Sequence, residues 1–285
     1  MGQPMRTVRH MLSIVVPVYC GGKTLQELVK RTDDTMINGL NNQAYEIILV
    51  DDKSPDESFK VIKDLCRRHE NVVGIQLKKN YGQQNATYCG LYYASGDVVI
   101  TMDDDLQHDP HHIPSLLCQM KAGRDLVYGV FETRDDGFCR QIGSKLTARF
   151  FKRKYKALKG LRVSSFRAIQ RSLIDRILTE TCVDEEKSFI YLSCLLLEKS
   201  NGVSNVILPY SERKEGSSNY NLFKLAKLYL KLQAYYGHLS PLFEGVLASK
   251  NKAFEVESVV KKGHEGVEKN ESHDAWWRNK SAVCH

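Results

Sequence analysis

Short apolar runs alternate with amphipathic segments through the first half of the chain. Runs rich in Val, Ile and Leu predict five buried strands, at residues 12–18, 45–50, 72–77, 98–102 and 126–130. Between them apolar residues recur at helical spacing, and we expect helices at residues 25–40, 57–69, 84–94 and 112–121. Strands joined by helices of this length form right-handed βαβ units. The pattern therefore predicts an α/β fold with a mostly parallel sheet flanked by helices.

The second half of the chain has a different pattern, helical and basic from Gly137 onward. We expect a strand at residues 203–208 and helices at residues 173–178, 189–198 and 221–236. The pattern divides the chain into an α/β domain (11–208), a segment with an amphipathic helical extension (209–248) and a polar C-terminal tail (249–285). The tail is rich in Lys, Glu, His and Asn with little periodicity, so we expect it to be loosely attached.

Composition favours a cytoplasmic protein. The chain of 285 residues is 42% hydrophobic and 26% charged, which is typical of soluble globular proteins. It contains no apolar run of about 18 residues, the length of a membrane-spanning helix, and no apolar signal segment near the N-terminus. The eight cysteines form no CxxC pair. This scatter argues against a zinc site and a disulfide framework, and fits buried thiols in a reducing compartment.

The net charge of +7 is unevenly distributed. Residues 137–174 contain eleven Lys and Arg residues and no Asp or Glu. Such a stretch attracts substrate phosphates, an anionic membrane surface or nucleic acid, although a solvated basic surface is an equally good interpretation. Few aromatic residues are interleaved for base stacking, apart from Phe150, Phe151 and Tyr155. We therefore expect no nucleic-acid partner.

Two acidic clusters follow predicted strands. Asp51-Asp52 comes after the second strand and Asp103-Asp104-Asp105 after the fourth. The carboxyl ends of parallel strands meet at one edge, so both clusters should face one crevice. Adjacent carboxylates repel unless a cation compensates, and hard oxygen ligands favour Mg²⁺ or Mn²⁺ bound together with substrate phosphates. The alternatives are a helix N-cap before Glu57 and an acidic turn at residues 103–105.

The order of these motifs is similar to that of the family 2 glycosyltransferases. Ile14–Tyr19 and Glu46–Asp56 resemble the opening of that family. Further segments resemble its branch of dolichol-phosphate mannose synthases and bacterial polyprenyl-phosphate glycosyltransferases: Asn80–Ala86, Gly90-Leu91, Ala94–Asp97, Met102–His108 and Arg213–Asn221. Neither a P-loop nor a GxGxxG motif is present, which argues against other phosphate-binding classes.

The resemblance implies an inverting transferase of the nucleotide-diphospho-sugar (GT-A) fold that uses a nucleotide-sugar donor. It implies a donor site made of Pro17, Tyr19, Asp51, Asp52, Asp103, Asp104, Gln107 and Ser217. Mg²⁺ or Mn²⁺ would be held by Asp103, Asp105 and Gln107. The catalytic group would be Asp105, Arg134 and Arg213, with Arg213 and Ser217 on a segment that closes over donor and acceptor phosphates.

The chain departs from the family pattern at several positions. Cys20 and Gly21 stand where Asn and Glu are usual, Phe131 where Arg is expected, and His111 where Glu is usual. Ser164-Ser165 replaces the commoner Gly-Asp. These changes leave the expected metal ligands intact, but they leave the donor sugar and the acceptor open.

The helix expected at residues 221–236 bears on the acceptor. Lys224, Lys227 and Lys231 fall on one stripe of an otherwise apolar helix, which suits a membrane interface with anionic head groups. Packing on the core or across a homo-oligomer is the alternative. We expect transfer to a polyprenyl phosphate by a peripheral protein at the cytoplasmic membrane face. A transferase with a soluble or glycan-chain acceptor, and a catalytically silent sugar-nucleotide or nucleic-acid binding module, stay open as alternatives.

Overall fold

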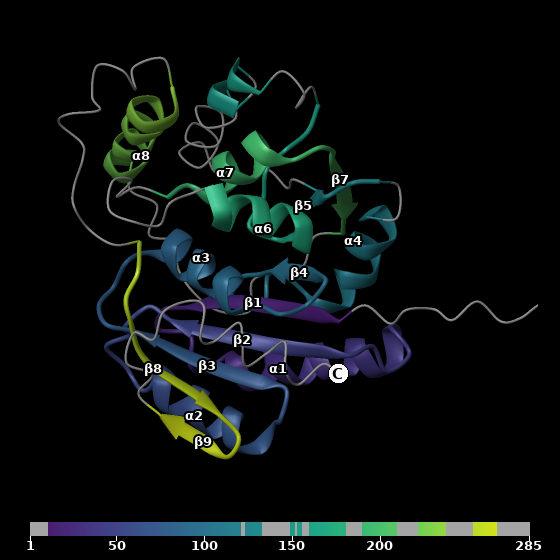
Figure 1. Ribbon diagram of the computed structural model, residues 1–285, viewed down its shortest axis with the longest axis vertical. Coiled ribbons are helices and arrows are strands. Elements are labelled where there is room, and N and C mark those ends of the chain that lie inside the picture. Colours follow the sequence, from purple (N-terminus) through teal and green to yellow (C-terminus); the bar gives the residue numbers. More distant parts are fainter. Residues whose placement is uncertain are drawn as a thin grey trace, which may run out of the picture.

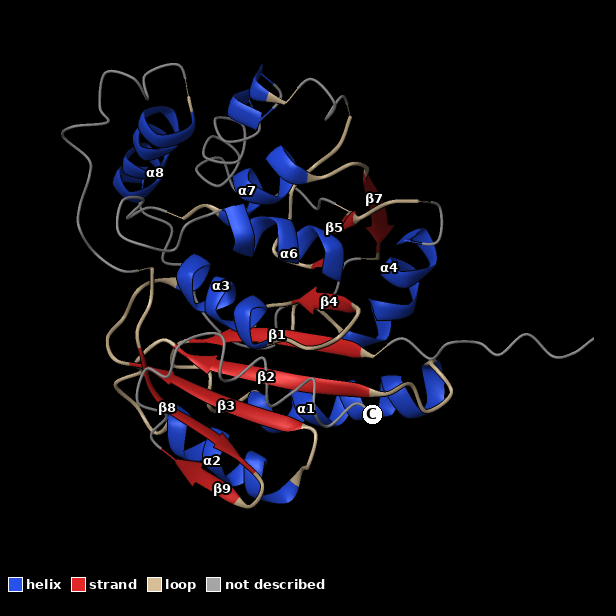
Figure 2. Ribbon diagram, in the orientation of Figure 1, coloured by secondary structure: helices blue, strands red, loops and turns tan. Residues whose placement is uncertain are grey.

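A single twisted sheet organises the described part of the chain (Figures 1 and 2). The computed structural model describes residues 11–120, 123–132, 149–151, 153–155, 160–180, 190–209, 222–237 and 253–266. Within these ranges nine strands lie in the order β7-β5-β6-β4-β1-β2-β3-β8-β9. Their bounds are β1 Leu12–Val18, β2 Tyr45–Asp51, β3 Val72–Leu77, β4 Val98–Thr101, β5 Leu126–Phe131, β6 Arg167–Gln170, β7 Val203–Leu208, β8 Val256–Lys261 and β9 His264–Gly266.

The central strands β4, β1, β2 and β3 are parallel, and helices cover both of their faces. All seven residues of β1 are buried, as expected of a strand with helices above and below it. The helices are α1 Leu25–Asp34, α2 Ser58–Arg68, α3 Gln83–Tyr93, α4 Ile113–Met120, α6 Arg171–Glu180, α7 Leu192–Lys199 and α8 Leu222–Tyr236. Two short turns complete the set, a π-helical turn η1 (Thr35–Gly39) and a 3₁₀ turn η2 (Pro110–His112).

Two apolar layers enclose the sheet. Apolar side chains of α1, α2 and α4 pack on one face, and those of α3, α6 and α7 pack on the other. The five strands expected in the first half and the strand at residues 203–208 are confirmed. The predicted α/β architecture follows from them, because each buried central strand matches a mostly apolar run.

Three of the described strands, β6, β8 and β9, were not expected from the sequence. β6 lies in a region predicted to be helical, and it pairs antiparallel with both β4 and β5. Near the C-terminus, β8 pairs antiparallel with β3 and continues the sheet (Figure 1). The expectation of a loosely attached tail from Ser249 is therefore wrong for residues 256–266. The limits of the three predicted segments otherwise stay a prediction.

The second half of α8 packs onto the protein. Leu232 is fully buried with Phe150, Phe151 and Cys194, whereas Leu230 is exposed. This arrangement matches the alternative of a helix packed on the core, as far as its described side chains go. No helix in the described ranges is long and apolar enough to cross a membrane.

The position of β8 leads to a stability prediction. Val259 is buried against the sheet, so Val259→Asp should lower the free energy of unfolding by about 3 kcal/mol, the order expected when an unpaired carboxyl group is buried. The melting temperature should fall by roughly 10 °C in thermal unfolding. Glu257→Gln on the exposed side of the same strand is the control and should have little effect. Equal melting temperatures for both variants would mean that β8 adds nothing to the fold.

Candidate active site

The loops that follow β1, β2 and β4 meet at the carboxyl edge of the central strands. Asp51 ends β2, and Asp103, Asp104 and Asp105 follow β4. The two acidic clusters lie at the same edge, as predicted, and the segment Tyr81–Gln83 connects them. Its backbone binds Asp52 and its Gln83 side chain binds Asp103, so the clusters belong to one hydrogen-bonded unit.

Asp52 is almost completely buried, with 3% of its surface exposed. Its two carboxylate oxygens accept hydrogen bonds from the backbone N–H groups of Tyr81 (2.7 Å) and Gly82 (2.8 Å), directly before α3. Burial raises its pKa, and these two hydrogen bonds act in the opposite direction. Asp52 therefore shapes the entry to α3. It does not cap α2, where Asp56 accepts the N–H of Ser58 instead.

The loop after β1 is clamped onto the loop after β2. The N–H of Cys20 donates to Ser54 Oγ and the N–H of Gly22 donates to Ser58 Oγ, both at 3.0 Å. Cys20 adopts a positive φ of 59°, a conformation that non-glycine residues rarely take outside constrained loops. The clamp leaves the Tyr19 side chain pointing into solvent, with 53% of its surface exposed, while Pro17 is buried inside β1.

Asp103 is held from two sides. Its Oδ1 accepts a hydrogen bond from Gln83 Nε2 (2.5 Å), and its Oδ2 accepts one from Ser165 Oγ (2.9 Å). Its backbone N–H donates to Nδ1 of the buried His108 (2.9 Å). Neither Gln83 nor Ser165 was predicted as a site residue. The match of Asn80–Ala86 to the family pattern pointed to the first, and nothing in the sequence pointed to the contact made by the second.

Phe131, one of the departures from the family pattern, belongs to an aromatic stack. The ring of His108 stacks on Phe166 at 5.2 Å and on Phe131 at 5.7 Å between centroids. Phe131 therefore supports His108, which in turn fixes the backbone of Asp103.

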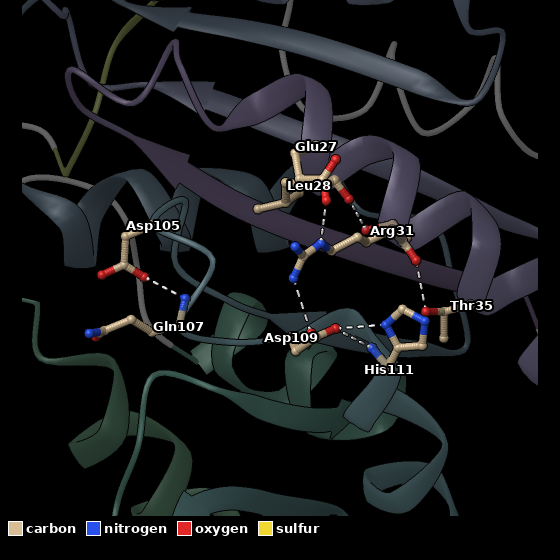
Figure 3. A network of polar contacts seen from close by, with 9 residues as sticks. Glu27, Leu28, Arg31, Thr35, Asp105, Gln107, Asp109 and His111 are labelled. Atoms are coloured by element: carbon tan, nitrogen blue, oxygen red, sulfur yellow. Dashed lines mark hydrogen bonds and ion pairs between the residues drawn. The ribbon is translucent and has the colours of Figure 1, made fainter. Parts of the chain in front are cut away.

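The far end of the acidic loop is tied to α1 (Figure 3). Arg31 Nη1 donates to Asp109 Oδ2 (3.2 Å), and the N–H of His111 donates to Asp109 Oδ1 (3.0 Å). Burial raises the pKa of Asp109, but the hydrogen bonds from His111 and the charge of Arg31 bring it below the usual value. His111, another departure from the family pattern, thus helps to hold the Asp109 carboxylate in place. Figure 3 shows Asp105 and Gln107 side by side on the same loop, where Asp105 Oδ1 accepts the N–H of Gln107 (3.1 Å).

Asp104 turns toward the β1 loop. Its Oδ2 accepts the N–H of Tyr19 (3.3 Å), and its backbone oxygen accepts a hydrogen bond from Thr24 Oγ1 (2.5 Å). A Cβ atom on Gly21 would lie 2.0 Å from Asp104 Oδ2, so the carboxylate fills the space that a side chain at position 21 would need. Burial, together with Asp103 and Asp105, raises the pKa of Asp104 to about 7.

The donor set of the acidic loop fits a hard divalent cation. The described residues contain no group of three or more His, Cys, Asp or Glu side chains that could hold a metal. Mg²⁺ and Mn²⁺ need only one or two carboxylates when phosphate oxygens and water complete the shell. Asp103, Asp105 and the amide of Gln107 offer oxygen ligands of this kind on one loop, and their role as metal ligands stays a prediction. The three remaining predicted residues, Arg134, Arg213 and Ser217, lie outside the described residues.

The contact between Gly21 and Asp104 predicts coupled stability effects. Gly21→Ala should destabilise the protein by about 1–3 kcal/mol, the usual cost of forcing an extra carbon into a packed site. Asp104→Ala in the same chain removes the clashing carboxylate and should restore most of the lost melting temperature. Thermal unfolding of the two single variants and the double variant, in EDTA, measures this coupling. Purely additive effects would contradict the contact.

Comparison with known proteins adds relatives on both the sequence and the fold level. The chain is 33% identical over 220 residues to an undecaprenyl-phosphate 4-deoxy-4-formamido-L-arabinose transferase of Enterobacter sp. (strain 638), covering 77% of this chain and 65% of that protein. A transferase of the same name from Pseudomonas fluorescens is 35% identical over 228 residues, covering 78% of this chain and 64% of that protein. The chain thus spans slightly less than two thirds of the length of these relatives.

Solved structures share the fold at low sequence identity. Mannosyl-3-phosphoglycerate synthase from Rubrobacter xylanophilus has a TM-score of 0.58 at 18% identity, covering 85% of this chain and 77% of that chain. A mannosyltransferase from Pyrobaculum calidifontis, in complex with GDP-Man and Mn²⁺, has a TM-score of 0.56 at 14% identity, with coverages of 85% and 69%. These similarities confirm the predicted GT-A type fold. The model of the family described as "Glycosyl transferase family 2" matches residues 13–178, more than half of the sequence, and the chain therefore belongs to glycosyl transferase family 2.

Proposed function

We propose that this chain is a metal-dependent, inverting glycosyltransferase that moves a sugar from a nucleotide-diphospho-sugar to a polyprenyl phosphate. The observation that carries the proposal is the acidic loop Asp103–Gln107, which lies at the carboxyl end of β4 inside the region matched by the family. Relatives with 33–35% identity are named as transferases acting on undecaprenyl phosphate, which supports the acceptor class.

The donor would lie across the loops after β1, β2 and β4. The exposed ring of Tyr19 offers an aromatic face to the nucleoside, next to buried Pro17. Asp51 and Asp52, buried at the end of β2, would lie beneath the nucleoside, and the second lone pairs of Asp52 could accept a hydrogen bond from the base. Because Asp52 also holds Tyr81 and Gly82, its loss would disturb the entry to α3 as well as the nucleoside contact.

The diphosphate would lie at Asp103, Asp104, Asp105 and Gln107, with Asp103, Asp105 and Gln107 holding Mg²⁺ or Mn²⁺. A bound divalent cation would supply charge compensation for the departing nucleoside diphosphate. A phosphate acceptor is already anionic, so its oxygen can attack the anomeric carbon without a general base, while the bond from that carbon to the donor diphosphate breaks. The chain's remaining task is to align the two phosphates and stabilise their charge. Arg134, Arg213 and Ser217 are proposed for that role from the family resemblance alone.

The soluble-acceptor alternative differs in where the protein works. A polyprenyl phosphate resides in a membrane, so the protein would have to act at a membrane surface. Lys224 and Lys227 on α8, together with the basic residues between 137 and 162, supply charges suited to anionic head groups. A soluble acceptor would need no such attraction, so membrane binding distinguishes a polyprenyl phosphate acceptor from a soluble one.

Metal-dependent turnover should need Asp105. Asp105→Asn removes one charged oxygen ligand while keeping the side-chain shape, so turnover should fall by about 10²-fold or more. Asp109→Asn is a matched control on the same loop, because Asp109 binds Arg31 and His111 and should lose stability rather than metal response. Release of nucleoside diphosphate from a panel of donors, with Mn²⁺, Mg²⁺ or EDTA, gives the measurement. Turnover in EDTA that is equal for wild type and Asp105→Asn would overturn the metal assignment.

Vesicle binding tests the acceptor. Wild-type protein should float with vesicles containing anionic lipid, and the binding should weaken with salt because the Debye length is only about 8 Å at physiological ionic strength. Lys224→Glu with Lys227→Glu should reduce both flotation and transfer to undecaprenyl phosphate, while slow donor hydrolysis continues. Lys60→Glu with Arg67→Glu makes the same charge change at exposed positions of α2 and should leave both intact. If wild type stays soluble at low salt, the lipid acceptor is wrong.

A further inference from the structure

We propose that a cavity beside Asp103 binds the phosphate of an amphiphilic phosphate monoester, with Arg167 as its buried cation. The identification of this monoester as the sugar acceptor rests on the proposed function, whereas the binding site itself does not. The cavity has a volume of 590 Å³. The beginnings of α3, β6 and α7 contribute to its walls, and Lys231 of α8 also lines it.

Arg167 is a buried cation without a carboxylate partner among the described residues. Only 2% of its surface is exposed, and it lines the cavity. Its Nε donates to Thr101 Oγ1 (3.0 Å) and its Nη1 donates to Ser193 Oγ (3.1 Å). Both partners are neutral hydroxyl groups. A buried charge is costly unless an opposite charge compensates it, so the site favours an anionic ligand.

Burial lowers the pKa of Arg167, and Tyr128 and the Asp103 carboxylate, which also lines the cavity, act in the opposite direction. The oxygens of Asp103 are already held by Gln83 and Ser165, and it is also one of the residues expected to hold the metal. A cation on Asp103 would offset that negative charge. Arg167 and Lys231 would then be the charged groups left in the cavity wall, which makes the wall electropositive toward a phosphate.

The cavity also has an apolar side. Val163, Ile190 and Tyr191 line it together with the polar groups. Inorganic phosphate would leave these side chains uncovered, whereas a phosphate attached to a hydrocarbon would bury them. At the other end, the N-terminus of α3 contributes the partial positive charge of its first turn, next to Gln83.

The cavity adjoins the acidic clusters. Asp103 lines it, and so do Tyr81 and Gly82, whose N–H groups bind Asp52. Pro17 and Tyr19 do not line it. A phosphate bound at Arg167 would therefore share the cavity with Asp103, one of the residues proposed to hold the metal, and an attacking acceptor oxygen has to be held close to the donor diphosphate.

Calorimetry with geranyl monophosphate, in Mg²⁺ and without donor, tests the site directly. Wild type should bind geranyl monophosphate more tightly than inorganic phosphate or geraniol. Only geranyl monophosphate has both a phosphate for the basic groups and a hydrocarbon for the apolar side chains of the cavity. Arg167→Gln should weaken binding at least tenfold. Lys231→Gln, at an exposed position, and Ser193→Ala, which removes a hydroxyl group from the cavity wall, should each weaken it severalfold. These two variants keep the test informative if Arg167→Gln does not fold.

Arg171→Gln is the matched control for loss of an inward-facing arginine. Arg171 donates to the backbone oxygens of Ala94 and Gly96 at the amino end of β4, so its loss should cost stability without changing geranyl monophosphate affinity. Equal affinity of wild type and all three cavity variants would overturn the site. Inorganic phosphate binding as tightly as geranyl monophosphate would overturn the amphiphilic ligand. Geranyl monophosphate binding that depends on Arg167, in a protein that transfers no sugar to polyprenyl phosphate, would uphold the site and reject the proposed acceptor.

Discussion

Five carboxylates at one edge of the sheet set the main constraint on this structure. Asp51 and Asp52 follow β2, and Asp103 to Asp105 follow β4, where parallel strands bring their ends together. Their mutual repulsion has to be offset by hydrogen-bond donors or by a cation. The Asp51 carboxylate accepts hydrogen bonds from the Gln76 side chain and the Ser54 N–H. The Asp52 carboxylate accepts hydrogen bonds from the backbone N–H groups of residues 81 and 82. The hydrogen-bond donors to Asp103 are neutral as well, so a divalent cation would add the missing positive charge.

The same constraint accounts for the shape of the surrounding loops. Cys20, Lys53 and Leu106 all have positive φ, one in each loop after β1, β2 and β4. Such conformations persist only where surrounding contacts enforce them. Here the contacts come from hydroxyl groups of Ser54 and Ser58 and from the Arg31–Asp109–His111 network. The loops are thus pre-arranged before any ligand binds, which lowers the cost of ordering them around a substrate.

The sequence predicted the centre of the fold better than its edges, for physical reasons. Central strands such as β1 are buried on both faces and therefore appear as mostly apolar runs. β6 is only four residues long and begins with the charged Arg167. Such a short segment among basic residues does not show the apolar run that predicts a buried strand. β8 lies at the edge and mixes buried and exposed positions, with Glu257 facing solvent. Its pairing depends on β3, nearly two hundred residues earlier, which no local pattern encodes.

The candidate site shows the same division between local and distant information. The acidic loop was found from its own residues, whereas the groups that hold it come from distant segments: Gln83, Ser165 and Phe131. Departures from the family pattern are also linked in space. Gly21 leaves the room that Asp104 occupies, and Phe131 packs on the His108 ring that fixes Asp103. Assigning roles from the family pattern one position at a time would therefore miss that residues 21 and 104 constrain each other. Because those residues join the β1 loop to the acidic loop, the proposed nucleoside side and the proposed metal side of the site are coupled through this contact.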